Sequence, residues 1–317
     1  MTSIKDTVRN TINRNSLTRK WFVAFCARFT IRLFMLQRFL SITDLQGKLQ
    51  MAAWRRVLAS LEETPLEKIE IAAGKATFVY QDGCAFEVSN SDASHSHALW
   101  LSAEYERTET ALLRRMVKPG WTAIDAGANY GWHAVHLSQL VGRDGKVFAF
   151  EPVPDTFQEL NTNVALNSCQ NLEVLRMAVG NSTDPINIYV PQIALGAGAA
   201  SQFLDVGQKI QAPMIRLDDF VKDKCLARVD FIKADIEGGE LGLLRGGENL
   251  LKTFHPTILI EIVDIHCRRF GHAPEDVYQY LTERGYTGRH ITDRGELVDL
   301  DPEHLPNGNF LFEPRQG

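Results

Sequence analysis

The spacing of hydrophobic positions changes along the chain and divides it into three segments. Residues 1–64 carry apolar positions at helical spacing, whereas residues 65–103 carry short runs in which apolar and polar residues alternate. In residues 104–317, short apolar runs alternate with stretches of helical period. We therefore expect a helical extension, a small β meander and a larger domain of alternating strands and helices.

The first segment concentrates positive charge at one end of the chain. Residues 1–40 contain eight Lys and Arg against one Asp, whereas the rest of the chain contains 26 against 38 Asp and Glu. On a helical wheel the basic side chains lie opposite a broad apolar face that includes Phe22 and Phe25. This face can lie on an anionic membrane surface, or it can pack on the larger domain or on a second subunit. Arg28 and Arg32 lie in the middle of the apolar stretch 21–40 and argue against a transmembrane span.

Composition narrows the class of protein. The chain has 317 residues, 44% of them hydrophobic, and a net charge of −5. Its five cysteines are scattered and never in C-x-x-C spacing, so the sequence suggests neither a disulfide framework nor a zinc site. A reducing compartment fits this pattern best. We expect a cytoplasmic protein, peripheral at the inner membrane surface if the basic helix binds lipid. The acidic remainder argues against a catalytic face for nucleic acid. His95 and His97 lack a third metal ligand nearby, which favours a solvated loop.

The alternating segments predict the elements of the two later regions. Residues 68–72, 76–80 and 85–88 are the expected strands of the meander. In the larger domain, strands are expected near residues 121–125, 146–150, 172–178, 229–234, 257–262 and 286–291, and helices follow most of them. This alternation predicts a doubly wound, mostly parallel sheet of Rossmann-like type whose ligand site lies at the carboxyl ends of its strands. We place residues 308–314 at an antiparallel edge and a mobile loop at residues 194–200.

A tight turn follows the first strand of the larger domain. Gly127 and Gly131 allow a sharp backbone bend, and the helix that follows presents unpaired N–H groups toward a ligand. Asp125 closes the strand before the turn. Glu151 ends the next strand, 20 residues after Gly131, where a carboxylate can accept both ribose hydroxyls of a nucleoside. The spacing of turn and acid therefore predicts a nucleotide-containing cofactor.

The glycine spacing discriminates between cofactors. A dinucleotide motif G-x-G-x-x-G that starts at Gly127 would require glycine where the chain has Asn129 and Trp132. An NAD-dependent oxidoreductase is therefore the weaker alternative. The pattern D-x-G-x-N-x-G instead resembles the first motif of class I methyltransferases that use S-adenosylmethionine (SAM), and asparagine at 129 tolerates a positive φ.

A second cluster of chemistry-bearing residues ends the strand near residues 229–234. Asp235, Glu237 and Glu240 follow this apolar run and precede a helix. Acidic residues stabilise a helix N-terminus, so capping is one interpretation of the cluster. The alternative is catalysis, because the carboxyl end of a central strand is where the ligand site is expected. Glu261 lies near the end of the next strand.

These pieces together resemble the FkbM family of SAM-dependent methyltransferases. The resemblance rests on residues 125–131, on the K-x-D-x-E-G-x-E pattern of residues 233–240, on residues 244–247 and on Glu261, and it covers residues 104–314. Residues 192–202 follow no pattern of the family. The resemblance implies methylation of a hydroxyl on a sugar, glycan or natural-product scaffold. A non-catalytic scaffold protein that keeps the fold is the alternative from another class.

The resemblance and the strand ends together give a set of expected site residues. The cofactor-binding residues that we expect are Asp125, Gly127, Ala128, Asn129, Gly131, Glu151, Pro152, Ala178 and Asp235. Asp235 and Glu237 are candidate bases for the acceptor hydroxyl, or, with Glu261, ligands of a divalent cation. His133 is a further catalytic candidate, with a helix-surface position as its alternative. The expected partners are a small-molecule or glycan acceptor and, through residues 1–40, a membrane surface or a second copy of the chain.

Overall fold

An eight-stranded sheet runs through the part of the chain that the computed structural model describes, namely residues 64–72, 75–88, 99, 105–190, 208–301 and 304–315. In spatial order its strands are β14 (Leu297–Asp299), β13 (Tyr286–Ile291), β15 (Gly308–Pro314), β12 (Thr257–Ile262), β11 (Phe231–Ala234), β4 (Thr122–Ala126), β5 (Lys146–Phe150) and β6 (Leu172–Leu175). The neighbours from β12 to β6 are all parallel, whereas β15 is antiparallel to both β12 and β13. The sheet order reverses beside β4, which places a ligand site at the carboxyl ends of β4 and β11.

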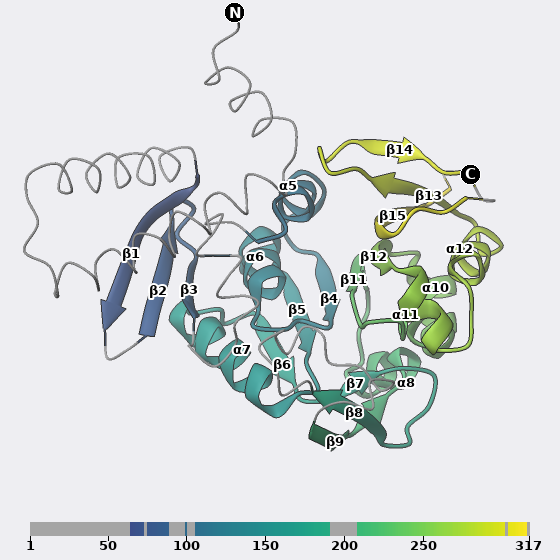
Figure 1. The fold of residues 1–317 in the computed structure, drawn as a ribbon, viewed down its shortest axis with the longest axis horizontal. Helices are drawn as coiled ribbons and strands as arrows, with labels where there is room; N and C mark the ends of the chain where they lie inside the picture. The colour runs from purple at the N-terminus through teal and green to yellow at the C-terminus, as the bar shows by residue number, and fades with distance from the viewer. Residues whose placement is uncertain are drawn as a thin grey trace, which may run out of the picture.

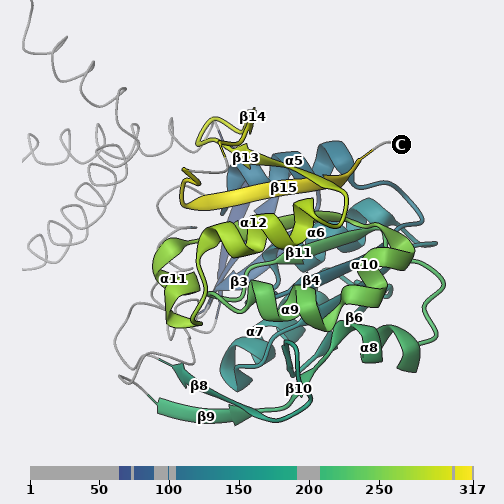
Figure 2. The ribbon, with the colours of Figure 1, turned by 90° about the vertical axis from the view of Figure 1, so that its right-hand side faces the viewer.

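Helices cover both faces of this sheet (Figures 1 and 2). One face packs against α5 (Arg107–Met116), α6 (Trp132–Val141) and α7 (Pro154–Leu166). The other packs against α8 (Leu217–Asp223), α9 (Glu240–Gly246), α10 (Glu248–Phe254), α11 (Asp264–Arg269) and α12 (Pro274–Thr282). The predicted doubly wound, Rossmann-like architecture is therefore confirmed.

The central strands read as continuous apolar runs because both of their faces are buried. Ala123 of β4 packs toward α5, α6 and α7, and the next residue, Ile124, packs toward the opposite layer. Phe231 and Ile232 of β11 divide in the same way. Successive side chains of a strand point to opposite faces, so each apolar pair contributes to both cores.

The predicted meander forms beside the large sheet. Its strands β1 (Leu66–Ala72), β2 (Lys75–Tyr80) and β3 (Ala85–Val88) pair antiparallel in the order of the chain. Phe78, Tyr80 and Phe86 of the meander share a buried cluster with Trp132 and Val135 of α6. Figure 1 shows the meander at the left of the molecule, with β3 next to α7.

Two expectations about strands are wrong in detail. Residues 308–314 form β15 in the interior of the sheet rather than at its edge, and Phe310, Leu311 and Phe312 are completely buried because helices cover both faces there. The strand expected at residues 172–178 ends at Leu175. The chain then leaves the sheet, and β7 (Ala178–Val179) pairs with β10 (Met214–Ile215).

A hairpin that the hydrophobic pattern did not predict follows β7. It consists of β8 (Ile186–Val190) and β9 (Gln208–Ala212), which pair antiparallel. The residues between them include the loop expected at residues 194–200, which lies outside the described residues, as do residues 1–63, His95 and His97. No helix within the described ranges has the length and apolarity needed to cross a membrane.

Candidate active site

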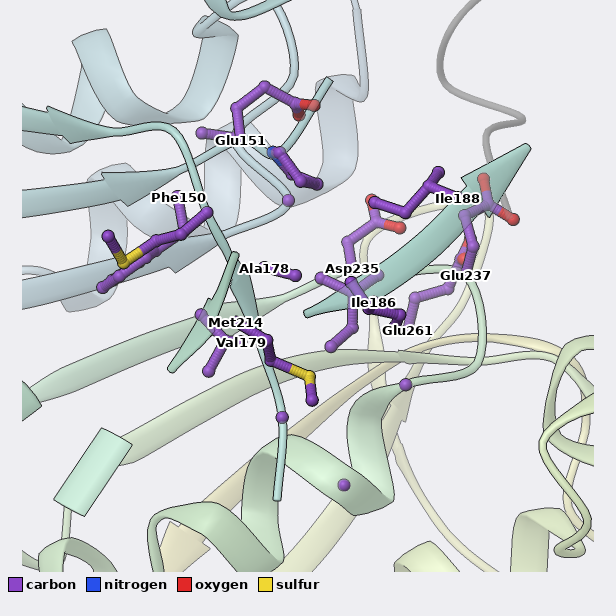
Figure 3. Close-up of a pocket in the computed structure, with 18 of the residues that line it drawn as sticks. Phe150, Glu151, Ala178, Val179, Ile186, Ile188, Met214, Asp235, Glu237 and Glu261 are labelled. Atoms are coloured by element: carbon purple, nitrogen blue, oxygen red, sulfur yellow. The ribbon is translucent and has the colours of Figure 1, made fainter. Parts of the chain in front are cut away.

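A cavity of about 620 Å³ opens where β4, β5, β11 and β12 end. Ala128 reaches its wall from the turn after β4, Glu151 from the end of β5, Asp235 from the end of β11 and Glu261 from β12. Figure 3 shows Glu151 on one side of the cavity, and Asp235, Glu237 and Glu261 gathered on the other. The parallel strands therefore bring together acids that are far apart in the sequence.

The turn after β4 closely approaches the end of β11. Gly127 has a φ of 80°, and a Cβ atom built there would lie 1.9 Å from the carbonyl oxygen of Asp235. Asn129 has a φ of 52°, which confirms the expectation that this asparagine takes a positive φ. Gly131 has a φ of 98° and immediately precedes α6, and unlike Gly127, Ala128 and Asn129 it does not line the cavity. Gly127 is therefore required by the neighbouring strand itself, in addition to any ligand.

Glu151 fastens this turn from the side of β5. Its Oε2 atom accepts a hydrogen bond of 3.0 Å from the Asn129 N–H, and its Oε1 atom accepts one of 2.9 Å from the Val153 N–H. The side chain is buried, and burial raises the pKa of Glu151 to about 7, although the two backbone hydrogen bonds oppose this rise. Pro152, which follows Glu151, and Ala178 also line the cavity, as expected.

Asp125 lies behind the turn and not among the residues that line the cavity. The side chain is completely buried, and within the described residues neither carboxylate oxygen has a hydrogen-bond partner. Burial raises the pKa of Asp125 to about 6, and Lys233, its register neighbour in β11, opposes this rise. The structure therefore gives Asp125 no direct face toward a ligand and pairs it electrostatically with Lys233.

Lys233 is a buried cation beneath the acidic side of the cavity. Its Nζ atom lies 3.1 Å from Oδ2 of Asp235, and the residue is 3% exposed. Burial lowers the pKa of Lys233, but the negative charges of Asp235, Glu106 and Asp125 outweigh that effect and hold the pKa above its usual range. Sequence reasoning did not assign Lys233 to the site. The available signal was a lysine within an otherwise apolar strand, two residues before Asp235.

Glu237 and Glu261 crowd the same side of the cavity. Burial, followed by the charge of Asp235, raises the pKa of Glu237 to about 8. The same two causes raise the pKa of Glu261 to about 9, with Glu237 contributing as well. Glu237 has a φ of 56°, and its Oε2 atom lies 3.1 Å from Nδ1 of His266. These carboxyl groups therefore exchange protons in the neutral to mildly alkaline range.

Glu240 separates from the other two acids of the cluster. Its Oε1 atom accepts hydrogen bonds from the N–H groups of Ile236, at 3.0 Å, and Gly238, at 3.2 Å. It begins α9, is buried and does not line the cavity. Glu240 therefore lies in the first turn of α9, where its charge suits the helix N-terminus, and its hydrogen bonds hold the loop before the helix, whereas Asp235 and Glu237 face the cavity.

His133 lines the cavity and is buried, so the helix-surface alternative for this residue is wrong. Its Nε2 atom lies 3.5 Å from Oε2 of Glu106, and burial lowers the pKa of His133 well below its usual range. Glu106 immediately precedes α5, has a φ of 42° and also lines the cavity, and burial raises its pKa to about 7. Glu106 is a second site residue that the sequence did not reveal, because α5 brings it to the cavity from outside the strand ends.

The described residues bring three metal-ligand atoms within 4.8 Å of one another at Asp82, Cys84 and His136. This group lies between the meander and α6, and Asp82 also forms an ion pair with Arg114, which already supplies a positive charge. Asp235, Glu237 and Glu261 are not such a group. The three acids therefore do not bring one oxygen atom each within 4.8 Å of one another, as the ligand atoms of Asp82, Cys84 and His136 do.

Comparison with known proteins relates the chain to methyltransferases. A family model described as "Methyltransferase FkbM domain" matches residues 125–287. The chain is 30% identical over 159 residues to the hexuronic acid methyltransferase AglP of Haloferax volcanii, in a match that covers 50% of this chain and 60% of that protein. It is 26% identical over 172 residues to the 31-O-demethyl-FK506 methyltransferase FkbM of Streptomyces tacrolimicus, in a match that covers 45% and 66%.

Among solved structures, the methyltransferase FkbM of Methylobacillus flagellatus is 18% identical, with a TM-score of 0.39. That match covers 68% of this chain and 52% of the other. The chain spans 60% of the length of the Haloferax protein and 66% of the length of the Streptomyces protein.

The raised pKa of Glu261 predicts how the stability of the fold depends on pH. Glu261 has a pKa raised from 4.5 to about 9, so in the folded protein it keeps a proton that the unfolded chain has already lost. The free energy of unfolding therefore falls as the pH rises between these two values. The Glu261→Gln side chain cannot ionise. We therefore expect the free energy of unfolding of this variant to fall less between about pH 5 and about pH 8 than that of the unaltered protein.

Urea unfolding at successive pH values measures this difference, and Glu275→Gln, at an exposed position on α12, is the matched control. Equal pH dependence of Glu261→Gln and the unaltered protein would contradict the assigned environment of Glu261.

Proposed function

The chain belongs to the methyltransferase FkbM family, and we propose that it transfers a methyl group from SAM to a hydroxyl oxygen of a small molecule or glycan. The observation that carries the proposal is the division of the cavity into two sides. One side presents a glycine-containing turn fastened by the buried carboxyl of Glu151. The other gathers Asp235, Glu237 and Glu261 (Figure 3). The first side suits the cofactor and the second suits the acceptor.

Several residues of the first side fit SAM. Each carboxyl oxygen of Glu151 accepts one backbone N–H and has a further lone pair for a ribose hydroxyl. Phe150, Val179 and Met214 provide apolar lining that suits an adenine base. When bound, SAM supplies a methyl group on a positively charged sulfur, and the acids on the other side of the cavity are compatible with that charge. The turn of residues 127–131 would hold the methionine end.

The second side suits an acceptor hydroxyl. Methyl transfer is an in-line displacement, so holding the acceptor oxygen in line contributes much of the rate. The hydroxyl must also lose its proton, and a base whose pKa lies near neutral performs this step most efficiently. Glu237, with a pKa raised to about 8, has this property, and Asp235 lies beside it with its charge balanced by Lys233. We propose that Asp235 and Glu237 orient and deprotonate the acceptor, and that His133, whose pKa is lowered by burial, is a weaker further base on the cavity wall.

The proposed reaction is tested with purified protein, SAM and fractions of metabolites and glycans. We expect mass spectrometry to show a product heavier by one CH2 group that appears only when both protein and SAM are present. A parallel reaction with a chelator tests the use of a divalent cation, because activity that is lost with chelator and restored by magnesium would show that the reaction uses one. Failure to methylate any hydroxyl-bearing acceptor, despite tight SAM binding, would favour the non-catalytic alternative.

The ribose contact predicts the behaviour of Glu151→Ala. Loss of the carboxylate removes charge-assisted hydrogen bonds, so SAM binding should weaken by about 1 to 3 kcal/mol. Isothermal titration calorimetry measures the change, and Asp144→Ala, at an exposed position in the loop before β5, is the control for removal of a carboxylate. Unchanged affinity in Glu151→Ala would show that the ribose does not bind there.

The acceptor side predicts a different result for Asp235→Asn. This substitution keeps the shape of the side chain and removes its charge, so we expect the affinity for SAM to persist while kcat falls by about a hundredfold or more. Asp223→Asn, at an exposed position on α8, should leave both quantities unchanged. Retention of full turnover in Asp235→Asn would remove this residue from the catalytic group.

A further inference from the structure

We propose that Asn163 is a positioning residue through which the N-terminal meander holds the turn of residues 127–131, called the cofactor turn below. The side chain is completely buried on α7 and bonds in two directions. Its Oδ1 atom accepts a hydrogen bond of 2.8 Å from the Glu87 N–H of β3, and its Nδ2 atom donates one of 2.8 Å to the carbonyl oxygen of Tyr130. One amide group therefore joins the meander to the turn. The inference rests on the proposed function, because the turn is the proposed SAM site.

The side of β3 that faces away from β2 depends on Asn163 of α7 and on Asn167, the C-cap residue of that helix. Asn167 lies one helical turn after Asn163, and its Oδ1 atom accepts a hydrogen bond of 2.8 Å from the Ala85 N–H. Its Nδ2 atom donates to the carbonyl oxygens of Ala85, at 2.6 Å, and Asn163, at 2.7 Å. An open strand edge exposes unpaired backbone groups, and these two amides pair with that edge in place of another strand. Both asparagines fasten the meander, but only Asn163 also bonds the cofactor turn.

Aromatic packing reinforces the same connection. The ring of Phe86 from β3 lies 4.6 Å from that of Trp132 and 6.1 Å from that of Tyr130, measured between centroids. Tyr130 and Trp132 flank Gly131, and both line the cavity. A side chain of the meander thus supports, from behind, the two aromatic residues of the turn that face the cavity.

Contacts from two sides determine the geometry of the turn. Gly127, Asn129 and Gly131 all have positive φ, and because glycine and asparagine can also adopt other conformations, hydrogen bonds from neighbouring elements hold this one. Glu151 holds the Asn129 N–H from the side of β5, and Asn163 holds the Tyr130 carbonyl from the side of α7. Removal of the Asn163 amide would leave a carbonyl of a buried residue without this partner, and the turn could then relax away from the geometry that binds the cofactor.

The test compares Asn163→Leu with Asn167→Leu in the full chain. Both substitutions replace the side-chain amide of an asparagine, in α7 or at its C-cap, with an apolar group of similar size, and both remove bonds to β3. Only Asn163→Leu also removes the bond to Tyr130. We expect Asn163→Leu to weaken binding of S-adenosylhomocysteine about tenfold, whereas Asn167→Leu lowers the melting temperature but changes that affinity by less than about twofold. Asn163→Ser, which is smaller and polar, should weaken binding in the same direction if Asn163→Leu does not fold.

Hydrogen exchange of the amides of residues 127–132 provides a readout that needs no ligand. The inference requires faster exchange in Asn163→Leu, or in Asn163→Ser, than in Asn167→Leu, because only the Asn163 variants release the turn. Equal exchange in the two sets of variants, or equal losses of affinity, would overturn the role of Asn163. Faster exchange in the Asn163 variants, together with no binding of S-adenosylhomocysteine by the unaltered protein, would support the role of Asn163 in holding the turn and contradict the proposed function.

Discussion

The buried ammonium group of Lys233 is the interaction on which the candidate site depends. It lies 3.1 Å from Asp235, and the carboxyl groups of Asp125 and Glu106 contribute to its charged state. Burial of several acids without a cation would drive them to protonate or would destabilise the fold, because a low dielectric disfavours isolated charge. Lys233 offsets part of this cost at the end of the central strand β11. The central strand can therefore carry acids to the wall of the cavity.

The remaining acids show how environment divides similar residues among different roles. Glu240 accepts two backbone N–H groups and closes the loop before α9, although it lies only three residues after Glu237 in the sequence. Glu237 instead faces the cavity with a raised pKa, and Glu151 joins the cofactor turn to β5. In each case the partner supplied by the fold determines whether the carboxyl group supports the backbone or faces the cavity with a raised pKa.

Local patterns in the sequence were enough to predict most elements and several of the residues that line the cavity. The alternation of apolar and polar residues predicted β1, β2 and β3, and the motif of the turn after β4 predicted a positive φ at Asn129. The interior position of β15 could not be predicted, because strand order depends on contacts between distant segments. Lys233 belongs to the pattern of residues 233–240, but its role as the buried cation follows from strand register, and Glu106 reaches the cavity through the placement of α5, so neither role could be predicted from the sequence. The bonds of Asn163 to two separate segments are likewise visible only in the fold.

Direct titration of the unaltered protein with SAM, and in parallel with NAD, tests the central claim most directly. Isothermal titration calorimetry should show saturable binding of one SAM per chain and no binding of NAD, because Asn129 and Trp132 stand where a dinucleotide motif needs glycine. Binding of NAD in preference to SAM would contradict the assignment of the cavity. Absence of binding by either compound would contradict the claim that the turn and Glu151 form a cofactor site.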